Sequence, residues 1–505
     1  MKTQRQLCLV AEANTYIDLL MEAWNLVKPN GGTGEKWLTY TRSEDMQHNN
    51  QTPAIIISAT HSGAGKTTVT RALLAALKAR GLAVQPFKIG PDFIDPMYHS
   101  VIVGRPSVNL DLWMMGEAGI RDVFSRWSQN ADVAVIEGMG ALFDGENGTG
   151  KGSAAHIAKI LGIPVVAVID VYGMTRTTAA IMDGLDSFDP DVKIAGFILN
   201  RCGYMGSAVH TNLIRNAVGE ERWKRVLSIV SNSPALEVAE RHLGLVTTYE
   251  NAASNDNSSL NHVAKQIDVE KVFGSSLQAN ANLKSQSAKP PVRPQKARLA
   301  VARDAAFCFY YEENLAALKA AGFEIVEFSP IKGDTLPPDT DALYFGGGYP
   351  ESFARELANN VNLAAQLRHV AKLGMPIYGE CGGMIYLGRS LTGFDGKTWS
   401  MSGVLPVDFV MDPSYLQIRY IELTTRRDSL LGPAGTVIRG QEFHQSRVAN
   451  SGLSSDFYTA KTSNGHEYID GYQYRNVVAS YAHIYLNSCE NVAHSFVNAA
   501  RNFKR

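Results

Sequence analysis

The sequence predicts an α/β protein in which two parallel-sheet domains follow one another along the chain. Strand-like and helix-like stretches alternate in both halves of the 505 residues, a pattern that favours parallel sheets. Each half also has a Gly-rich turn between an apolar strand and a helix, at residues 59–68 and 379–383. We expect one domain at 53–250, a polar linker at 251–297 that contains a short helical piece at 262–273, and a second domain at 298–505. Residues 1–52 form an N-terminal extension whose role the sequence does not indicate.

The composition excludes several classes of function. The chain has 48 basic and 49 acidic residues and a net charge of −1, so it offers no basic footprint for nucleic acid or an acidic membrane. No apolar run reaches the roughly 18 residues of a membrane-spanning helix, and the polar N-terminus argues against a signal peptide. Five Cys, few and odd in number, suggest a reducing compartment, for which we expect the cytoplasm.

The first Gly-rich turn predicts a nucleotide site. An apolar strand at 54–58 leads into Ala59-Thr-His-Ser-Gly-Ala-Gly-Lys-Thr-Thr68, and a helix follows. Backbone N–H groups at such a turn cradle phosphates, a Lys reaches the outer phosphates, and a Thr hydroxyl binds Mg²⁺. The pattern departs from the strict motif because Thr60 occupies the first Gly position. The residues expected to bind ATP are Gly63, Gly65, Lys66, Thr67, Thr68 and, at a later strand end, Asn200.

Carboxylates follow the next strands, at the edge where open α/β sheets bind ligands. A stiff loop bracketed by two prolines has Asp92 and Asp95, and a third strand ends at Glu137, shortly before Asp144. We expect Thr67, Glu137 and Asp92 to hold Mg²⁺. We expect Asp92, Asp95 and Asp144 to line the substrate site of a synthetase. The alternative for these three aspartates is turn capping, which Asp does often.

The second Gly-rich turn has the form of a nucleophile elbow that presents a thiol. An apolar strand runs into Gly379-Glu-Cys381-Gly-Gly383, and a helical pattern follows. The helix N-terminus is expected to lower the pKa of the Cys381 thiol and to stabilise an oxyanion. The alternative is a small buried Cys between a strand and a helix.

Two other stretches in the same half offer the remaining parts of such a site. Three glycines follow the strand at 341–345, and we expect Gly347, Gly348 and Gly382 to form an oxyanion hole. A tight turn is the alternative for the three glycines. A strand at 477–482 ends in His483, the expected general base for Cys381, although a lone His is more often structural.

Residues 298–490 resemble a class I glutamine amidotransferase domain of the cobyric acid synthase subgroup, which has a flavodoxin-like fold. The matching stretches are 303–315, 344–351, 379–383 and 479–483. Ordinary class I domains have a Glu two residues after the His, whereas this chain has Tyr485, as is usual in the subgroup. The resemblance therefore implies a Cys381–His483 dyad without a third, carboxylate member. Glu380, beside the nucleophile, is expected to point away from His483.

Residues 53–250 resemble the ATP-dependent synthetase domain of the cobyrinic acid a,c-diamide synthase family, within the dethiobiotin synthetase-like P-loop superfamily. The most specific matches are 88–99, 137–145 and 239–245. The resemblance implies a ligase that uses L-glutamine, ATP and Mg²⁺ to amidate the a and c acetate groups of a cobyrinic (or hydrogenobyrinic) acid-type corrinoid, through acyl phosphates. The protein could form a homodimer, but the sequence does not indicate its oligomeric state.

Two alternatives to this function remain open. The first is a nickel-sirohydrochlorin a,c-diamide synthase, which performs the same chemistry on another tetrapyrrole. The second is a regulatory P-loop ATPase with a degenerate amidotransferase domain.

Overall fold

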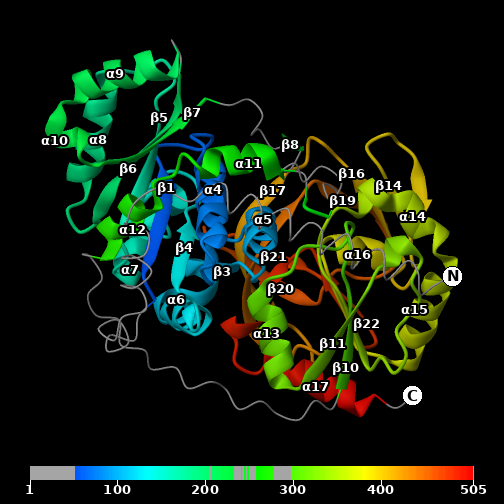
Figure 1. Cartoon of the computed structure of the whole chain (residues 1–505). Coiled ribbons are helices and arrows are strands. Elements are labelled where there is room, and N and C mark those ends of the chain that lie inside the picture. Colours follow the sequence, from blue (N-terminus) through cyan, green and yellow to red (C-terminus); the bar gives the residue numbers. More distant parts are fainter. Residues whose placement is uncertain are drawn as a thin grey trace. The chain divides into compact units, whose positions relative to one another are not determined.

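Two mainly parallel sheets organise the chain, as the alternating sequence pattern predicts (Figure 1). The computed structural model describes residues 52–203, 206–232, 240–241, 244–245, 247–249, 257–277 and 297–503. Residues 52–505 form one compact unit. The extension expected at 1–52 lies, apart from Thr52, outside the described residues. Within the described ranges, no helix is both long and apolar enough to cross a membrane.

The first sheet has seven strands, all parallel, in the order β3-β2-β4-β1-β5-β6-β7. β1, β2, β4 and β5 are buried along their whole length, as in a sheet that is covered on both faces. The strands are β1 Ala54–Ala59, β2 Val84–Ile89, β3 Val108–Leu110, β4 Val133–Glu137, β5 Val165–Asp170, β6 Ile194–Cys202 and β7 Val226–Ser231.

Helices follow most strands of this sheet, and the Gly-rich loop joins β1 to the first of them. They are α4 Lys66–Ala79, α5 Ile94–Val103, α6 Leu112–Ser128, α7 Ala154–Leu161, α8 Thr177–Phe188, α9 Ser207–Val218 and α10 Glu220–Trp223. β1 lies in the middle of the sheet, paired with β4 on one side and β5 on the other. The carboxyl ends of β1, β2 and β4 therefore meet at one edge, beside the loop.

Part of the segment expected as a linker is helical. α11 (Asn257–Ala264) and α12 (Val269–Leu277) bury Val263, Val272 and Phe273, and Oγ of Ser228 on β7 accepts the N–H of Asp268 at 2.8 Å. α11 contacts α4 and lies across one end of it (Figure 1). The described part of 251–297 thus packs on the first sheet, and a two-stranded ribbon, β8 Glu240–Arg241 and β9 Gly244–Leu245, precedes it. The domain limits themselves stay a prediction.

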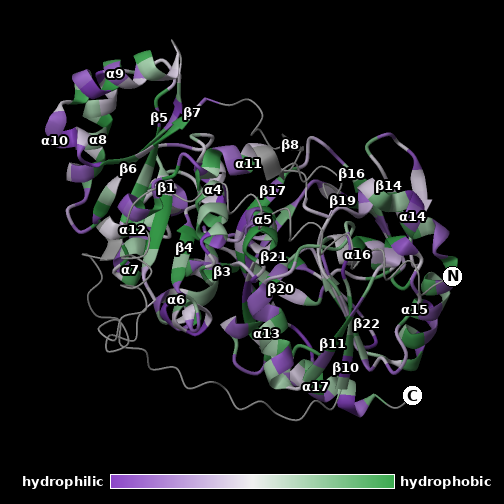
Figure 2. Cartoon of the chain, viewed as in Figure 1, coloured by the Kyte–Doolittle hydropathy of each residue, from purple (hydrophilic) through white to green (hydrophobic). Residues whose placement is uncertain are grey.

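The second sheet has six strands in the order β11-β10-β12-β13-β23-β22, and only the edge strand β22 is antiparallel to its neighbour. β12, β13 and β23 are buried along their whole length, and Figure 2 colours the chain by hydropathy. The strands are β10 Ala297–Ala302, β11 Phe323–Phe328, β12 Ala342–Phe345, β13 Ile377–Glu380, β22 Tyr472–Tyr474 and β23 Val477–Ser480. The helices are α13 Glu312–Ala321, α14 Ala354–Asn359, α15 Val361–Leu373, α16 Gly382–Leu387 and α17 Val492–Asn502.

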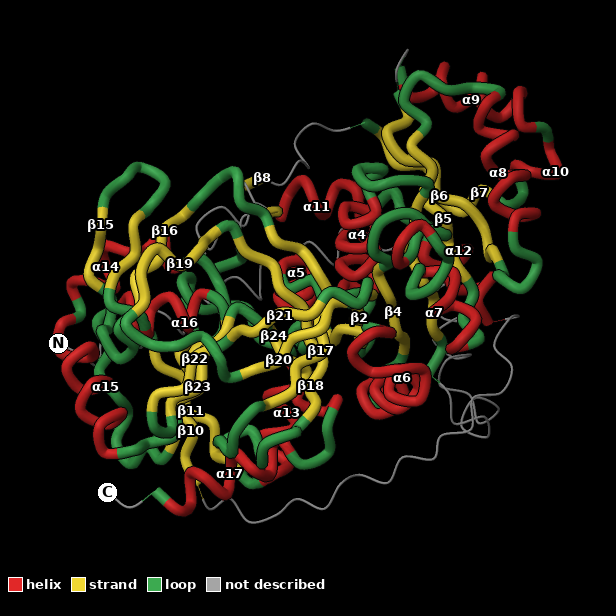
Figure 3. The backbone as a smooth tube through the Cα atoms, turned by 180° about the vertical axis from the view of Figure 1, so that it is seen from behind, coloured by secondary structure: helices red, strands yellow, loops and turns green. Residues whose placement is uncertain are grey.

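Two smaller, mostly antiparallel sheets follow the elbow, and the sequence analysis did not anticipate them (Figure 3). One consists of β14 Ser390–Thr392, β15 Thr398–Ser400, β16 Val407–Met411 and β19 Ser446–Ser451. The other consists of β17 Gln417–Thr425, β18 Val437–His444, β20 Tyr458–Thr462, β21 Glu467–Asp470 and β24 His483–Tyr485. β24 pairs with β18, so the His predicted as a base belongs to this last sheet rather than to the parallel one.

The two halves of the unit touch through polar and aromatic contacts. Trp113 Nε1 donates to the carbonyl of Ile421 at 3.2 Å, and Tyr420 Oη donates to Asp111 Oδ2 at 2.6 Å. Arg126 forms an ion pair with buried Glu313 at 2.8 Å. These contacts hold both ends of α6 against the second half.

Candidate active site

The Gly-rich loop after β1 has the backbone of a phosphate cradle. Gly63 and Gly65 adopt left-handed φ angles of 83° and 92°, which Gly adopts most readily. A Cβ at Gly65 would lie 2.0 Å from Nδ2 of Asn200, so a larger residue does not fit there. α4 begins at Lys66, with Thr67 and Thr68 in its first turn, so free N–H groups at a helix start face the loop.

Asn200 lies at the end of β6, and its amide supports the loop directly. Nδ2 donates to the carbonyl of Ala64 at 2.9 Å. The expected role of Asn200 in ATP binding stays a prediction, because the contact that the structure gives is with the loop backbone.

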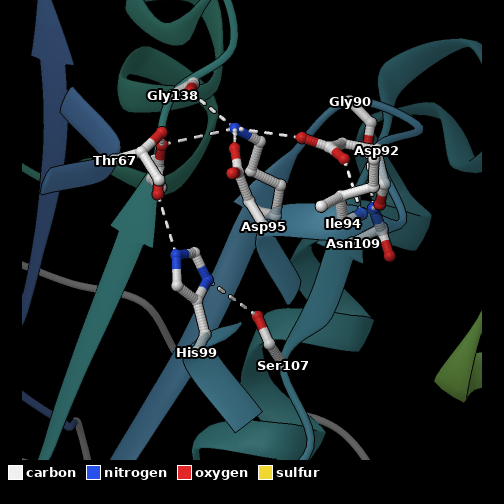
Figure 4. A network of polar contacts seen from close by, with 11 residues as sticks. Thr67, Gly90, Asp92, Ile94, Asp95, His99, Ser107, Asn109 and Gly138 are labelled. Carbon is white, nitrogen blue, oxygen red and sulfur yellow. Dashed lines mark hydrogen bonds and ion pairs between the residues drawn. The ribbon is translucent and has the colours of Figure 1, made fainter. Parts of the chain in front are cut away.

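Lys88, near the end of β2, is surrounded by carboxylates, and dashed lines in Figure 4 mark these contacts. Its Nζ lies 2.5 Å from Asp95 Oδ2, 3.4 Å from Asp92 Oδ2 and 3.4 Å from Glu137 Oε1. It also donates to the carbonyl of Gly138 at 3.3 Å. Lys88 and Glu137 are register partners on β2 and β4, so the sheet itself brings this cluster together. The sequence analysis assigned no role to Lys88.

Glu137 is fully buried and accepts hydrogen bonds from three directions. Thr67 Oγ1 donates to Oε1 at 2.7 Å, and His99 Nε2 lies 2.8 Å from Oε2, with Lys88 as the third partner. Burial alone would raise the pKa of Glu137, but Lys88, His99 and Thr67 hold it well below its ordinary value. Glu137 is therefore a carboxylate that stays charged beside the P-loop. No local pattern singles out His99, whose contact with Glu137 depends on the packing of α5 against β2 and α4.

The other charges of the cluster are shifted in different directions. Burial would lower the pKa of Lys88, yet Glu137, Asp95 and Asp92 raise it above its ordinary value. Burial and Glu137 raise the pKa of Asp95 in spite of Lys88. Burial lowers the pKa of Lys66. Asp95 thus takes up a proton more readily than Glu137 does.

Thr67 and Glu137 fit a Mg²⁺ ion that is bound together with a nucleotide. Both present oxygen ligands, which Mg²⁺ prefers, and they lie 2.7 Å apart at the loop. Mg²⁺ at a nucleotide takes one or two protein ligands and completes its shell with phosphates and water. The described residues hold no group of three or more His, Cys, Asp or Glu arranged for a metal.

Asp92 is a turn cap that also faces Lys88, and its roles in binding Mg²⁺ and substrate stay predictions, whereas Asp144 stands apart. Asp92 Oδ1 accepts the N–H of Ile94 at 2.8 Å, which is a turn cap, while Oδ2 faces Lys88 at 3.4 Å. Asn109 Nδ2 fixes the same loop by donating to the carbonyl of Asp92 at 2.7 Å. Asp144 is exposed, and no hydrogen bond or ion pair within the described ranges joins it to the Lys88 cluster.

The second candidate centre is the elbow between β13 and α16. Cys381 has φ 47° and ψ −106°, a left-handed φ that is strained for a residue with a side chain. Its N–H donates to the carbonyl of Ser480 on the neighbouring strand at 2.8 Å. The sharp turn predicted from the sequence is present, and Cys381 lines a pocket together with Phe309, Gly348, Glu351 and His444.

The thiol of Cys381 is held in its neutral form in this structure. Burial, and then the negative charge of Glu351, raise the pKa of Cys381, and the N–H of Gly382 opposes this shift only in part. The expectation of a lowered pKa is therefore wrong for this state, because the side chain is buried and Glu351 is nearby. Sγ donates weakly to the carbonyl of Phe443 at 3.8 Å.

The glycines predicted to form an oxyanion hole come together from two loops. A Cβ at Gly382 would lie 3.1 Å from the N of Gly348, and a Cβ at Gly347 would lie 2.2 Å from Cε1 of His483. The loop after β12 therefore lies against both the elbow and the imidazole. The oxyanion role of these N–H groups stays a prediction.

His483 is buried at the start of β24, and its closest charged neighbour is Glu380. Nδ1 lies 3.7 Å from Glu380 Oε2. The expectation that Glu380 points away from His483 is thus wrong, because the carboxylate lies on the side of β13 that faces β24. Among the described residues no hydrogen bond joins Cys381 Sγ to His483, so the dyad stays a prediction.

His444, at the end of β18, is a second imidazole beside the thiol, and the sequence analysis missed it. Its Nδ1 lies 2.8 Å from the carbonyl of Ser446, which fixes that nitrogen as the donor, and its ring stacks on Tyr481 at 3.7 Å. Burial lowers the pKa of His444 to about 4, so the ring is neutral at pH 7. The sequence signal for His444 is a strand pattern that ends in His. This signal was not recognised because the antiparallel sheets were not predicted.

An aromatic cluster connects the two candidate centres. Phe93, between Asp92 and Asp95, stacks on Phe309 at 5.0 Å and on Tyr311 at 4.5 Å. The ring of Phe93 also lies 4.9 Å from that of His483. One loop of the first half thus contacts Lys88 through its carboxylates and His483 through its ring.

Fold and site together define a glutamine amidotransferase with a nucleotide-binding domain in the same chain. Residues 298–490 match the family model of a CobB/CobQ-like glutamine amidotransferase domain, and residues 55–246 match that of a CobQ/CobB/MinD/ParA nucleotide binding domain.

Curated relatives make the assignment narrower. A cobyrinate a,c-diamide synthase of Syntrophotalea carbinolica is 38% identical over 89% of this chain and 99% of its own length. The cobyrinate a,c-diamide synthase of Priestia megaterium is 37% identical over 89% of this chain and 98% of its own length. That of Methanosarcina barkeri is 38% identical over 91% of this chain and 98% of its own length. The chain belongs to the cobyrinate a,c-diamide synthase family. A solved PurLQS structure from Thermotoga maritima is 18% identical and covers 42% of this chain and 100% of its own chain. Its TM-score of 0.31 is too low to support a structural comparison.

Proposed function

We propose that this chain is an ATP-dependent, glutamine-hydrolysing ligase that amidates the a and c acetate groups of a cobyrinic acid-type corrinoid. The observation that carries the proposal is the combination of a thiol elbow at Cys381 with a P-loop that adjoins the Lys88 cluster. This combination lies in a chain that spans almost the full length of the cobyrinate a,c-diamide synthases it matches.

The glutaminase half releases ammonia. The Cys381 thiol attacks the side-chain amide carbon of glutamine while His483 takes the thiol proton and returns it to the departing ammonia. N–H groups of Gly347, Gly348 and Gly382 stabilise the oxyanion of the tetrahedral intermediate. Water then cleaves the thioester to glutamate and restores the thiol.

The synthetase half activates a carboxylate, which is otherwise a poor electrophile for ammonia. Lys66 and the loop N–H groups hold the ATP phosphates while a corrinoid carboxylate attacks the γ-phosphorus and ADP leaves. Ammonia then attacks the acyl phosphate, and phosphate leaves as the amide forms. Mg²⁺, bound through Thr67 and Glu137, neutralises phosphate charge when it is present. Lys88 supplies further positive charge at the same strand ends.

The test is amide formation by the purified protein from cobyrinic acid, ATP, Mg²⁺ and glutamine labelled with ¹⁵N in its side-chain amide. Mass spectrometry should count two labelled amides per ring, and Cys381→Ser should lose both unless ammonium salt is added. Nickel-sirohydrochlorin is the competing substrate, and exclusive amidation of that ring would replace the corrinoid in the proposal. ATP hydrolysis without amidation of either ring would indicate a regulatory ATPase.

We also propose that the chain works in a reducing compartment, the cytoplasm. Five Cys in 505 residues are few and odd in number, which suits such a compartment better than a disulfide framework does.

A further inference from the structure

The imidazole of His483 has one nitrogen that no protein group satisfies. Nδ1 is buried and has no hydrogen-bond partner among the described residues. A buried polar atom without a partner destabilises the fold, so such an atom in a predicted active site calls for an explanation. A catalytic imidazole needs a group at its second nitrogen, because that group fixes the ring and the tautomer.

The carboxylate of Glu380 is the acidic group nearest to this nitrogen. Its Oε2 lies 3.7 Å from Nδ1 of His483, and both side chains are almost completely buried, at 2% and 1% exposure. The residue that follows His483 helps to hold the carboxylate, since the N–H of Ile484 donates to Oε1 at 3.1 Å. Tyr344 Oη donates to Oε2 at 3.0 Å.

Neither of these two donors has a positive charge. Within the described ranges, His483 is the only basic side chain in ion-pair distance of Glu380. A buried carboxylate is costly unless a cation compensates it, and His483 becomes a cation when it takes the thiol proton. The charge of Glu380 is thus compensated at the step at which the proton moves.

We propose that Glu380 is the positioning carboxylate of His483, so that the glutaminase centre is a triad whose acid precedes its nucleophile in sequence. Tyr485 stands where ordinary class I domains have this acid, and the strand before the elbow supplies it instead. In the resting structure the two groups are 3.7 Å apart, and they close to a hydrogen bond when Nδ1–H faces a charged carboxylate. Nδ1–H is then directed at Glu380, which leaves Nε2 as the base.

The other titratable groups around the pair do not compete for this role. His444 on β18 is neutral at pH 7, because burial lowers its pKa to about 4, and Cys381 is a neutral thiol in this state. Burial raises the pKa of Tyr344, Tyr378 and Tyr458 well above the ordinary value, so these phenols near Glu380 are uncharged. Phe93 and Phe309 cover the imidazole with uncharged rings.

The test compares Glu380→Gln and Glu380→Asp in the full-length enzyme by the pH profile of glutaminase kcat/KM. Glu380→Gln should lower kcat by about 10- to 100-fold. It should also move the acid limb of the profile to lower pH, because loss of the negative charge makes the imidazole less basic. Glu380→Asp should recover part of the rate and return the acid limb towards its original position.

A matched control is Asp304→Asn, since Asp304 is a buried carboxylate of the same half that accepts backbone N–H groups. It should leave the acid limb in place. An unmoved acid limb in Glu380→Gln, or unchanged kinetics in Glu380→Asp, would overturn the proposal and leave Glu380 a structural acceptor. Ammonia-dependent synthesis reports folding of each variant, and if Glu380→Gln fails that check, Glu380→Asp decides alone.

This inference rests on glutamine hydrolysis at Cys381, which forms part of the proposed function. If the unmodified enzyme does not hydrolyse glutamine, or Cys381→Ser still does, the proposed function fails. If hydrolysis depends on Cys381 but Glu380→Gln behaves like the unmodified enzyme, only the triad fails.

Discussion

The ring of Phe93, on the loop after β2, lies 4.9 Å from the imidazole of His483 on β24. The same loop presents Asp92 and Asp95 to Lys88. A displacement of this loop at the synthetase centre therefore reaches the predicted base of the glutaminase centre through one side chain.

Phe93→Ala should lower glutaminase kcat on the order of 10- to 100-fold, because the imidazole loses one wall of its packing and small displacements of catalytic groups are costly. Ammonia-dependent synthesis should fall much less, since that reaction does not use His483. Phe188→Ala, at a largely exposed Phe in the first half, serves as the control. Equal losses with glutamine and with ammonia would show that Phe93 acts only on the synthetase centre.

Lys66→Ala should lower the rate of synthesis from both glutamine and ammonia by roughly 10²-fold or more, because the Lys charge stabilises the phosphates as the γ-phosphoryl group leaves. Glutamine hydrolysis by Cys381 should persist. Lys78→Ala, at an exposed position in the last turn of α4, should behave like the unmodified enzyme. If Lys66→Ala kept ammonia-dependent synthesis, the P-loop would not be the site at which the carboxylate is activated.

Lys88→Met should lower the free energy of unfolding by about 3–5 kcal/mol, because Glu137, Asp95 and Asp92 would lose their common cation in a buried site. Urea denaturation measures the change. Lys159→Met is the matched control, since its ion pair with Asp189 is partly exposed and should cost at most about 1 kcal/mol. A loss for Lys88→Met no larger than that of the control would mean that water enters the cluster.

Asp95→Asn should fold and bind ATP yet stall turnover or stop after one amidation, because the amide keeps the size of the carboxylate but removes its charge beside Lys88. Mass spectrometry of the product ring counts the amidations. Asp92→Asn should keep most of the turn-capping hydrogen bond, so that any loss of amidation rate would be due to the missing charge. Unmutated rates of diamide formation in both variants would reduce the two aspartates to structural roles.

His444→Phe should make stability less dependent on pH between about 4 and 6.5. Burial lowers the pKa of His444 from 6.5 to about 4 in the folded state, so within this window the unfolded chain binds the proton more readily. Stability therefore falls as the pH drops, by up to about 3 kcal/mol from this group. Denaturation midpoints at several pH values should show a shallower slope for the variant, with His369→Phe, at an exposed position on α15, as control. An unchanged slope would mean that His444 is already protonated when folded.

The sequence was most informative where a functional site is formed by elements that follow one another directly along the chain. A strand, a Gly-rich turn and a helix start predicted both centres, and the strand-end rule predicted that Asp92, Asp95 and Glu137 would lie beside the P-loop. Lys88 escaped notice because its role depends on its register with Glu137, which no local pattern displays.

The parts that were missed depend on packing between distant segments. His444 belongs to an antiparallel sheet whose pairing with β24 is set by tertiary contacts. The orientation of Glu380 depends on where the chain goes after Ser480, its partner on β23. Within the expected linker only one short helical piece, at 262–273, was predicted, because a polar composition concealed that apolar residues such as Val263 and Phe273 are fully buried on two separate helices.

The backbone of Cys381 has a φ of 47°, which a side chain tolerates only under strain. A Gly at this position would relieve that strain, by roughly 1 kcal/mol or more, and would give a more stable protein without a nucleophile. Stability and chemistry thus favour opposite residues at position 381. A search for thermostable variants that does not also select for glutamine use will therefore tend to discard the thiol.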